Sequence, residues 1–201
     1  PRFDVPRRVS PWLQDVTLTN VPMEAFALMA TEDVMLMGRC GILVEMAESP
    51  LTEVRPYFVS YAAENIINWD TTIIEGDEVL TLLVLRERPR RVDESDPFQY
   101  TTVEQYRELR LHLEGGALRY TQQVWQQPED GGEVEMVGPR LMPLRRGEPL
   151  PFIPFTFLGP AAVTTDVKDP SLLDLANLNL AHWRNTCDHE QGLHLVSLPT
   201  P

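Results

Sequence analysis

The sequence predicts an α+β fold, with a mostly antiparallel sheet region, an N-terminal helix packed on it and a long C-terminal helix. Three observations support this prediction. Apolar residues recur at helical spacing between residues 23 and 37, and the stretch 104–127 alternates in the manner of a β-hairpin. A second stretch with helical character follows residue 171.

The N-terminal helix is the first clear element, within "NVPMEAFALMATEDVMLMG". Asn20 is placed near its N-cap, and Pro22 suits the first helical position, where an N–H is not needed. Gly38 can end the helix in a left-handed conformation. The short strand "ILVEM" follows, and Gly41 just before it permits close contact between helix and strand. The apolar stripe of the helix consists of Met23, Phe26, Ala27, Ala30, Val34 and Met37.

The next stretch predicts further strands. A strand at Tyr57–Tyr61 is followed by a polar turn and by a short apolar segment that ends at Trp69. The segment "EVLTLLVLRER" contains a continuous apolar run, which predicts a strand buried on both faces. The charged, proline-flanked stretch "PRRVDESDPF" is predicted to be a loop.

A long β-hairpin is predicted from "EQYRELRLHLEGGALRYTQQVWQQ", with Gly115 and Gly116 at its turn. An acidic loop and a short strand follow in "PEDGGEVEMVG". The segment "PLPFIPFTFLGPAA" places four prolines among apolar residues, which favours an edge strand or an irregular extended segment.

The C-terminal helix is predicted from about Leu172 to Gln191, with a break at Gly192. The chain starts at Pro1 without an initiator methionine and stops just after an apolar run, so we expect a fragment of a longer polypeptide.

Composition limits the function classes. The chain has 201 residues, 43% of them hydrophobic, which is enough for a sizeable core. Its net charge of −13 disfavours proteins that grip the phosphates of DNA. No signal peptide and no long apolar stretch is recognised, so no membrane partner is expected. Cys40 and Cys187 lie far apart without a CxxC pattern, which argues against a disulfide framework.

The stretch "LANLNLAHWRNTCDHEQGLH" holds three histidines and a cysteine, which raises the possibility of a metal or catalytic site. On a helix, His182 and His189 share one face, whereas Cys187 and His194 lie on a face roughly 140–160° away. No face collects the three or four ligands of a zinc site, and no Cys–His pair is aligned for nucleophilic catalysis. We therefore predict no metal, no cofactor and no catalytic residue here.

Two other functions remain as alternatives. Glu64 and Asp70 in "YAAENIINWD" are two carboxylates at a spacing that a hydrolase acting on sugars could use. A surface turn anchored by Trp69 explains the same residues more simply. The other alternative is an acidic interaction module that recruits a basic partner.

Several strings occur in an order that resembles one family. These are "PWLQDVTLTNVPMEAFALMATEDVMLMGRCGILVEM", "RPYFVSYAAENIINW", "EQYRELRL", "YTQQVW", "PFIPFTFLG" and "LLDLANLNLAHWRNTCDHEQGLHLVSLPTP". Together they are similar to a group of tailed-bacteriophage portal proteins, the head-to-tail connectors. The resemblance covers nearly the whole chain.

The resemblance implies a structural role rather than an enzyme. Portals are homo-oligomeric rings, typically dodecamers, at one vertex of the capsid in the virion, and they assemble in the host cytoplasm. They nucleate capsid assembly, dock the terminase motor and the tail adaptor, and pass double-stranded DNA through a channel without sequence-specific binding. By this resemblance residues 1–160 form the wing, and residues 161–201 form the first stem helix, which leads toward a clip that this chain lacks.

The same resemblance makes the C-terminal helix a subunit interface. Leu175, Leu178 and Trp183 are expected to pack against neighbouring copies. The expected polar neighbours of these contacts are Asn177, Asn179, His182, Arg184 and Asp188.

Overall fold

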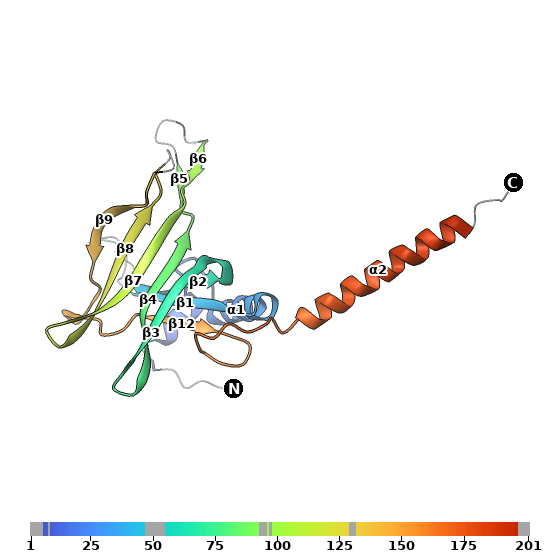
Figure 1. Ribbon diagram of the computed structural model, residues 1–201. Coiled ribbons are helices and arrows are strands. Elements are labelled where there is room, and N and C mark those ends of the chain that lie inside the picture. The colour runs from blue at the N-terminus through green and yellow to red at the C-terminus, as the bar shows by residue number, and fades with distance from the viewer. Residues whose placement is uncertain are drawn as a thin grey trace.

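The structure is a computed structural model, and its α+β arrangement confirms the predicted fold class (Figure 1). It describes residues 6–7, 9–46, 55–92, 96, 98–128 and 132–196. The helical elements are a 3₁₀ turn η1 (Ser10–Gln14), α1 (Met23–Met37), a second 3₁₀ turn η2 (Ala63–Asn65) and α2 (Leu173–Val196). The strands are β1 (Cys40–Met46), β2 (Pro56–Ala62), β3 (Ile66–Ile74), β4 (Asp77–Glu87), β5 (Arg90–Val92), β6 (Tyr100–Thr102), β7 (Gln105–Glu114), β8 (Ala117–Gln126), β9 (Glu135–Leu141), β10 (Leu144–Arg145), β11 (Glu148–Pro149) and β12 (Phe155–Leu158).

Two antiparallel sheets form the body of the protein. The larger has five strands in the order β3-β4-β7-β8-β9, and the smaller has three in the order β12-β1-β2. Two short ribbons, β5-β6 and β10-β11, extend from this body. Helix α1 packs on β1 and β2, whereas α2 extends away from both sheets (Figure 1).

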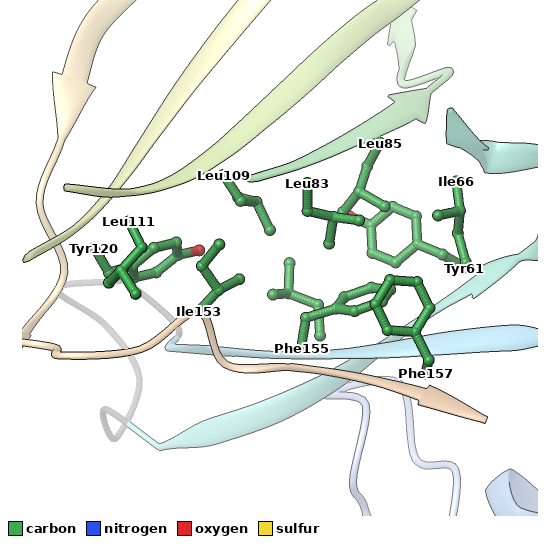
Figure 2. Packing of buried hydrophobic residues seen from close by; sticks show 11 residues of the cluster. Tyr61, Ile66, Leu83, Leu85, Leu109, Leu111, Tyr120, Ile153, Phe155 and Phe157 are labelled. Carbon is green, nitrogen blue, oxygen red and sulfur yellow. The ribbon is translucent and has the colours of Figure 1, made fainter. Parts of the chain in front are cut away.

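The hydrophobic core fills the space between the two sheets (Figure 2). Alternate residues of each strand point inward, because side chains of a strand alternate between its faces. Leu83 and Leu85 of β4 and Leu109 of β7 are fully buried in this way. Each such leucine contributes about 1.5–3 kcal/mol relative to an exposed one. The smaller sheet supplies a facing set made of Leu43, Tyr61, Phe155 and Phe157.

Helix α1 ends as predicted and begins one residue later than predicted. Gly38 caps it in the left-handed region, with φ of 76°. Pro22 is the N-cap residue rather than the first helical one. Phe26 and Ala30 are buried against the smaller sheet, and the Phe26 ring lies 5.5 Å from that of Phe58.

Two expectations about packing were wrong. Gly41 does give room for a close approach, but a Cβ at this position would overlap the ring of Phe155 in β12 rather than the helix. Strand β4 is fully buried only at Leu83 and Leu85, while Leu82 and Val84 are half-buried. Its second face is therefore only partly covered.

The long hairpin β7-β8 is confirmed, and its turn residues Gly115 and Gly116 have φ of 59° and 80°. The edge strand in the proline-rich segment is confirmed as β12. The segment expected to end at Trp69 continues to Ile74 as β3. The prediction of a loop at residues 89–98 was wrong in part, because this segment contains strand β5, which pairs with β6.

The C-terminal helix is longer than predicted. Helix α2 runs without interruption through Gly192 to Val196, so the predicted break was wrong. A single glycine in a helix costs only about 1 kcal/mol relative to alanine, and this does not suffice to end a helix of 24 residues.

Candidate assembly surface

Helix α2 has no buried residue anywhere along its length. Its large apolar side chains lie in solvent, and Leu178 and Trp183 are 68% and 62% exposed. A soluble monomer rarely leaves so long a run of apolar side chains uncovered, and contiguous exposed patches of this kind mark interaction sites. The helix therefore presents an uncovered apolar surface.

Most of the exposed apolar side chains of α2 fall on two stripes, whereas Leu195 lies on the polar side of the helix. With about 100° of rotation per residue, the two stripes lie roughly 140° apart around the helix axis. The first stripe contains Leu175, Leu178, His182, His189, Leu193 and Val196. The second stripe contains Leu173, Ala176, Leu180, Trp183 and Cys187.

All eight residues predicted for a subunit interface lie exposed on α2, but they do not share one face. The first stripe holds Leu175, Leu178 and His182, and the second holds Trp183. Two gaps of unequal width separate the stripes around the helix. The wide gap is a polar face that carries Asn177, Arg184 and Asp188, and the narrow gap holds Asn179. An open hollow of about 640 Å³ follows the first turns of the helix and is lined by Leu172, Leu175, Ala176, Leu178, Asn179 and His182.

The base of α2 is attached to the end of α1. The Leu172 backbone N–H donates a hydrogen bond to the Met35 carbonyl at 3.2 Å. Beside it, a Cβ on Gly38 would overlap the Lys168 carbonyl oxygen and press against Pro170. Gly38 thus serves two purposes, since its left-handed backbone ends α1 and its missing side chain lets the connection to α2 pass.

A polar cluster inside the body was not anticipated from the sequence. Arg107 on β7 forms ion pairs with Glu45 on β1 and with Glu87 on β4, and its Nε lies 2.8 Å from Glu87 Oε1. The side chains are largely buried, with 20% of Arg107 and 14% of each glutamate exposed. The cluster joins the smaller sheet to the larger one through charge.

Strand alternation is the signal that would have found this cluster. Glu45 lies two residues after buried Leu43, and Glu87 two residues after buried Leu85. Arg107 precedes buried Leu109 by two. Residues two apart on a strand share a face, so all three charges point toward the core and require partners there.

Every carboxylate oxygen of the cluster accepts from a neighbour. Glu45 Oε2 accepts from the Tyr57 hydroxyl at 2.8 Å, and its Oε1 accepts from Arg107. Glu87 Oε1 accepts from the Tyr61 hydroxyl at 2.6 Å, and its Oε2 accepts from the Gln105 amide at 2.8 Å. With its acceptors occupied in this way, the cluster is built as a clamp between the sheets rather than as a reactive site.

The tyrosines of this clamp predict a loss of stability at alkaline pH. Burial, together with the hydrogen bond to Glu45, raises the pKa of Tyr57 from 10.0 to about 12, and burial beside Glu87 raises the pKa of Tyr61 further. A raised folded-state pKa stabilises the fold below the unfolded value and loses this contribution as pH climbs through the folded value. We expect the free energy of unfolding, measured with urea, to fall between pH 10 and about 12.

The Tyr57→Phe variant is the control for this pH dependence. It lacks the titrating hydroxyl, so its unfolding free energy should fall less steeply over the same pH interval. Equal slopes for the variant and the parent would show that Tyr57 does not contribute.

A second buried cation lies where α1 meets β1. Arg39 is 5% exposed, and its guanidinium stacks 4.0 Å from the centre of the Trp69 ring and 4.4 Å from that of Phe157. Within the described parts of the chain, its Nε and Nη2 have no hydrogen-bond partner. Burial lowers its pKa, and the two rings offset part of that cost through cation–π attraction.

The alternative hydrolase residues are both exposed. The Glu64 backbone carbonyl accepts a hydrogen bond from Arg86 Nη2 at 3.1 Å, and Asp70 Oδ1 accepts from the Thr71 N–H at 2.9 Å. Neither carboxylate lines the hollow on α2 or the groove between the end of β1 and the β10-β11 ribbon. In this part of the chain, the arrangement gives a hydrolase no specific support.

The reactive side chains of α2 remain apart. Across the residues that the structure describes, no three His, Cys, Asp or Glu side chains gather into a group able to hold a metal ion. Cys40 is buried, Cys187 is exposed, and both are free thiols.

Comparison with known proteins adds one match to this geometry. Residues 171–201, which include all of α2, match a family model described as a domain of unknown function (DUF4055). No curated protein matches the chain. Neither described helix is long and apolar enough to cross a membrane. The match thus falls on the helix that leaves its apolar side chains uncovered.

Proposed function

We propose that this chain is a structural subunit of a viral portal ring, in which α2 joins neighbouring copies around a channel for double-stranded DNA. The observation that carries the proposal is the exposure of two separate apolar stripes on a helix without a buried residue. The similarity of the sequence strings to portal proteins supports the same assignment.

The position of the stripes suits a ring better than a pair. A helix that joins a two-fold dimer needs one apolar stripe, whereas a ring subunit uses two different surfaces, one for each neighbour. In a closed dodecamer, the directions from one subunit to its two neighbours differ by about 150°. The two stripes of α2 are separated by roughly 140°, which fits such a position.

We further propose that one face of α2 lines the channel. Seen from one subunit, the angle between the directions to its two neighbours is smaller than 180° on the side of the ring centre. The narrow strip between the stripes would therefore face the channel. That strip holds Asn179, Thr186 and Glu190, which are neutral or acidic. Such side chains do not hold phosphates, and the net charge of −13 favours a wall along which DNA slides without sequence-specific binding.

The remaining parts of the proposal come from the resemblance to portal proteins. The ring would form in the host cytoplasm, lie at the capsid vertex of the virion, and contact capsid proteins, the terminase motor and the tail adaptor. The subunit acts by assembly and needs neither enzymatic activity nor a cofactor.

Negative-stain microscopy combined with sedimentation tests the proposal. The protein is expected to sediment as a large oligomer and to appear as rings with a central hole. A protein that stays monomeric as its concentration is raised through the micromolar range would overturn the proposal.

A further inference from the structure

Helix α1 presents a second uncovered apolar surface. Phe26 and Ala30 face the sheet, but the opposite side of the helix is also apolar. Leu28 and Leu36 are each 61% exposed there, and they are accompanied by Met29 and Met35. Large apolar side chains gathered on an exposed face often mark an interaction site, so this outer face of α1 is a candidate contact surface.

The charges on α1 limit what that cover can be. The helix carries Glu24, Glu32 and Asp33 and has no basic residue. Glu32 lies in the middle of the outer face, between the leucines and methionines. A partner surface that fits must therefore be apolar at its centre and basic at its edge.

The same chain presents such a surface elsewhere. A groove of about 600 Å³ lies between the end of β1 and the β10-β11 ribbon, and none of the residues that line it belongs to α1. Its walls are mostly apolar and include Met46, Leu144 and Phe152, which are 53%, 58% and 44% exposed. Arg145 and Arg146 are among the residues that line it, and no acidic side chain of the described residues does.

Arg146 has an unusual backbone for its position. It precedes Gly147 in the turn between β10 and β11, and both residues have positive φ, 56° and 86°. Asparagine, aspartate or glycine is preferred at the first of these positions, because other side chains are strained there. The β3-β4 turn has the same pair of conformations at Glu75 and Gly76, with φ of 54° and 94°. Among the described residues, Arg145 and Arg146 form no ion pair.

We propose that the outer face of α1 of one copy docks into the groove beside β10-β11 of the neighbouring copy, with Glu32 facing Arg145 and Arg146. This inference rests on the proposed ring and adds a second contact between its subunits. The two surfaces differ, so the contact is head-to-tail and can continue around a ring. The fit resembles the helix-in-groove mode, in which the apolar face of a helix enters an apolar groove. Here Leu28, Met29, Met35 and Leu36 would supply that face.

Two other occupants fit the charges less well. A symmetric contact between the α1 helices of two copies would bring six acidic side chains together. Helix α2 offers apolar stripes, but Arg184 and three histidines lie among its acids, and its stripes are already assigned to other copies of α2. The acidic α1 is therefore the better partner for the two arginines.

Charge reversal tests the contact in the assembled protein. Glu32→Arg and Arg146→Glu, made separately, should each weaken association about tenfold, as measured by sedimentation over a dilution series. The double variant, Glu32→Arg with Arg146→Glu, should return to within about threefold of the parent, because the charges are again opposite. Asp77→Arg, an exposed reversal at the β3-β4 turn, is the matched control and should leave association unchanged.

The Arg146→Asn variant distinguishes weaker association caused by misfolding from weaker association caused by loss of the contact. Asparagine tolerates positive φ better than arginine, so this variant should keep or raise the thermal midpoint while still weakening association. A variant that is more stable and yet assembles less well cannot be explained by unfolding.

Each outcome of the test is decisive. An assembly that forms normally but ignores the reversals at Glu32 and Arg146 overturns this inference alone. Rescue of Arg146→Glu by a reversal at Asp174 or Asp188 would instead place α2 in the groove and also overturn it. A parent protein that never associates would overturn the proposed function, and this inference with it.

Discussion

Replacing both Leu178 and Trp183 by aspartate is expected to abolish assembly and to leave the fold of the body unchanged. The two side chains lie on different stripes of α2 and are 68% and 62% exposed, so neither takes part in the core of its own chain. Burying one large apolar side chain contributes about 1.5–3 kcal/mol, and each substitution also places a charge in the interface. Association should weaken by at least about a hundredfold, as measured by sedimentation.

Leu113→Asp is the matched control for this experiment. Leu113 lies beside the β7-β8 turn and is 73% exposed, so it is the same kind of residue at a distance from α2. The control should assemble normally, and near-ultraviolet circular dichroism should show unchanged packing in all variants. If the α2 variant still assembled normally, the stripes would not be the contact between copies.

The second large effect is expected inside the body, from Arg107→Met. The substitution leaves Glu45 and Glu87 facing the core without their cation, and loss of one partner from a buried ion pair typically costs about 3–5 kcal/mol. Urea unfolding followed by circular dichroism measures the loss.

A triple variant separates the charge effect from the packing effect. Replacing Glu45 and Glu87 by glutamine together with Arg107→Met removes all three charges and keeps side chains of similar size. This variant should recover much of the stability that Arg107→Met loses, since no uncompensated charge remains. A loss below about 1 kcal/mol for Arg107→Met would show that water or a rearrangement compensates the carboxylates.

Local signals in the sequence predicted both long helices and the main strands of the fold, but not the short ribbons β5-β6 and β10-β11. The end of α1 at Gly38 and the hairpin around Gly115 follow from backbone geometry that only certain residues adopt easily, so short strings determine them. Pairing between β1 and β12 could not be predicted in this way. It joins residues more than a hundred positions apart, and Gly41 marks it only through its contact with Phe155.

The C-terminal helix was predicted, but the arrangement of its apolar side chains in two stripes was not. The stretch after residue 171 was expected to be an interface helix, and helical geometry alone separates Leu178 from Trp183. The expected break at Gly192 hid the full length of the stripes, because it removed Leu193 and Val196 from the first one. The Arg107 clamp was missed because its members come from three strands, and only their shared inward position links them.

The attachment of α2 gives the protein a lever arm. Its 24 residues extend for about 36 Å, and the described contacts that fix their direction lie at the near end, around Leu172 and Gly38. A rotation of roughly 10° at that fulcrum displaces the far end by about 6 Å, more than one helical turn. The diameter of any ring built from this helix therefore depends on the few contacts around Leu172 and Gly38, although the displacement is greatest at the other end of α2.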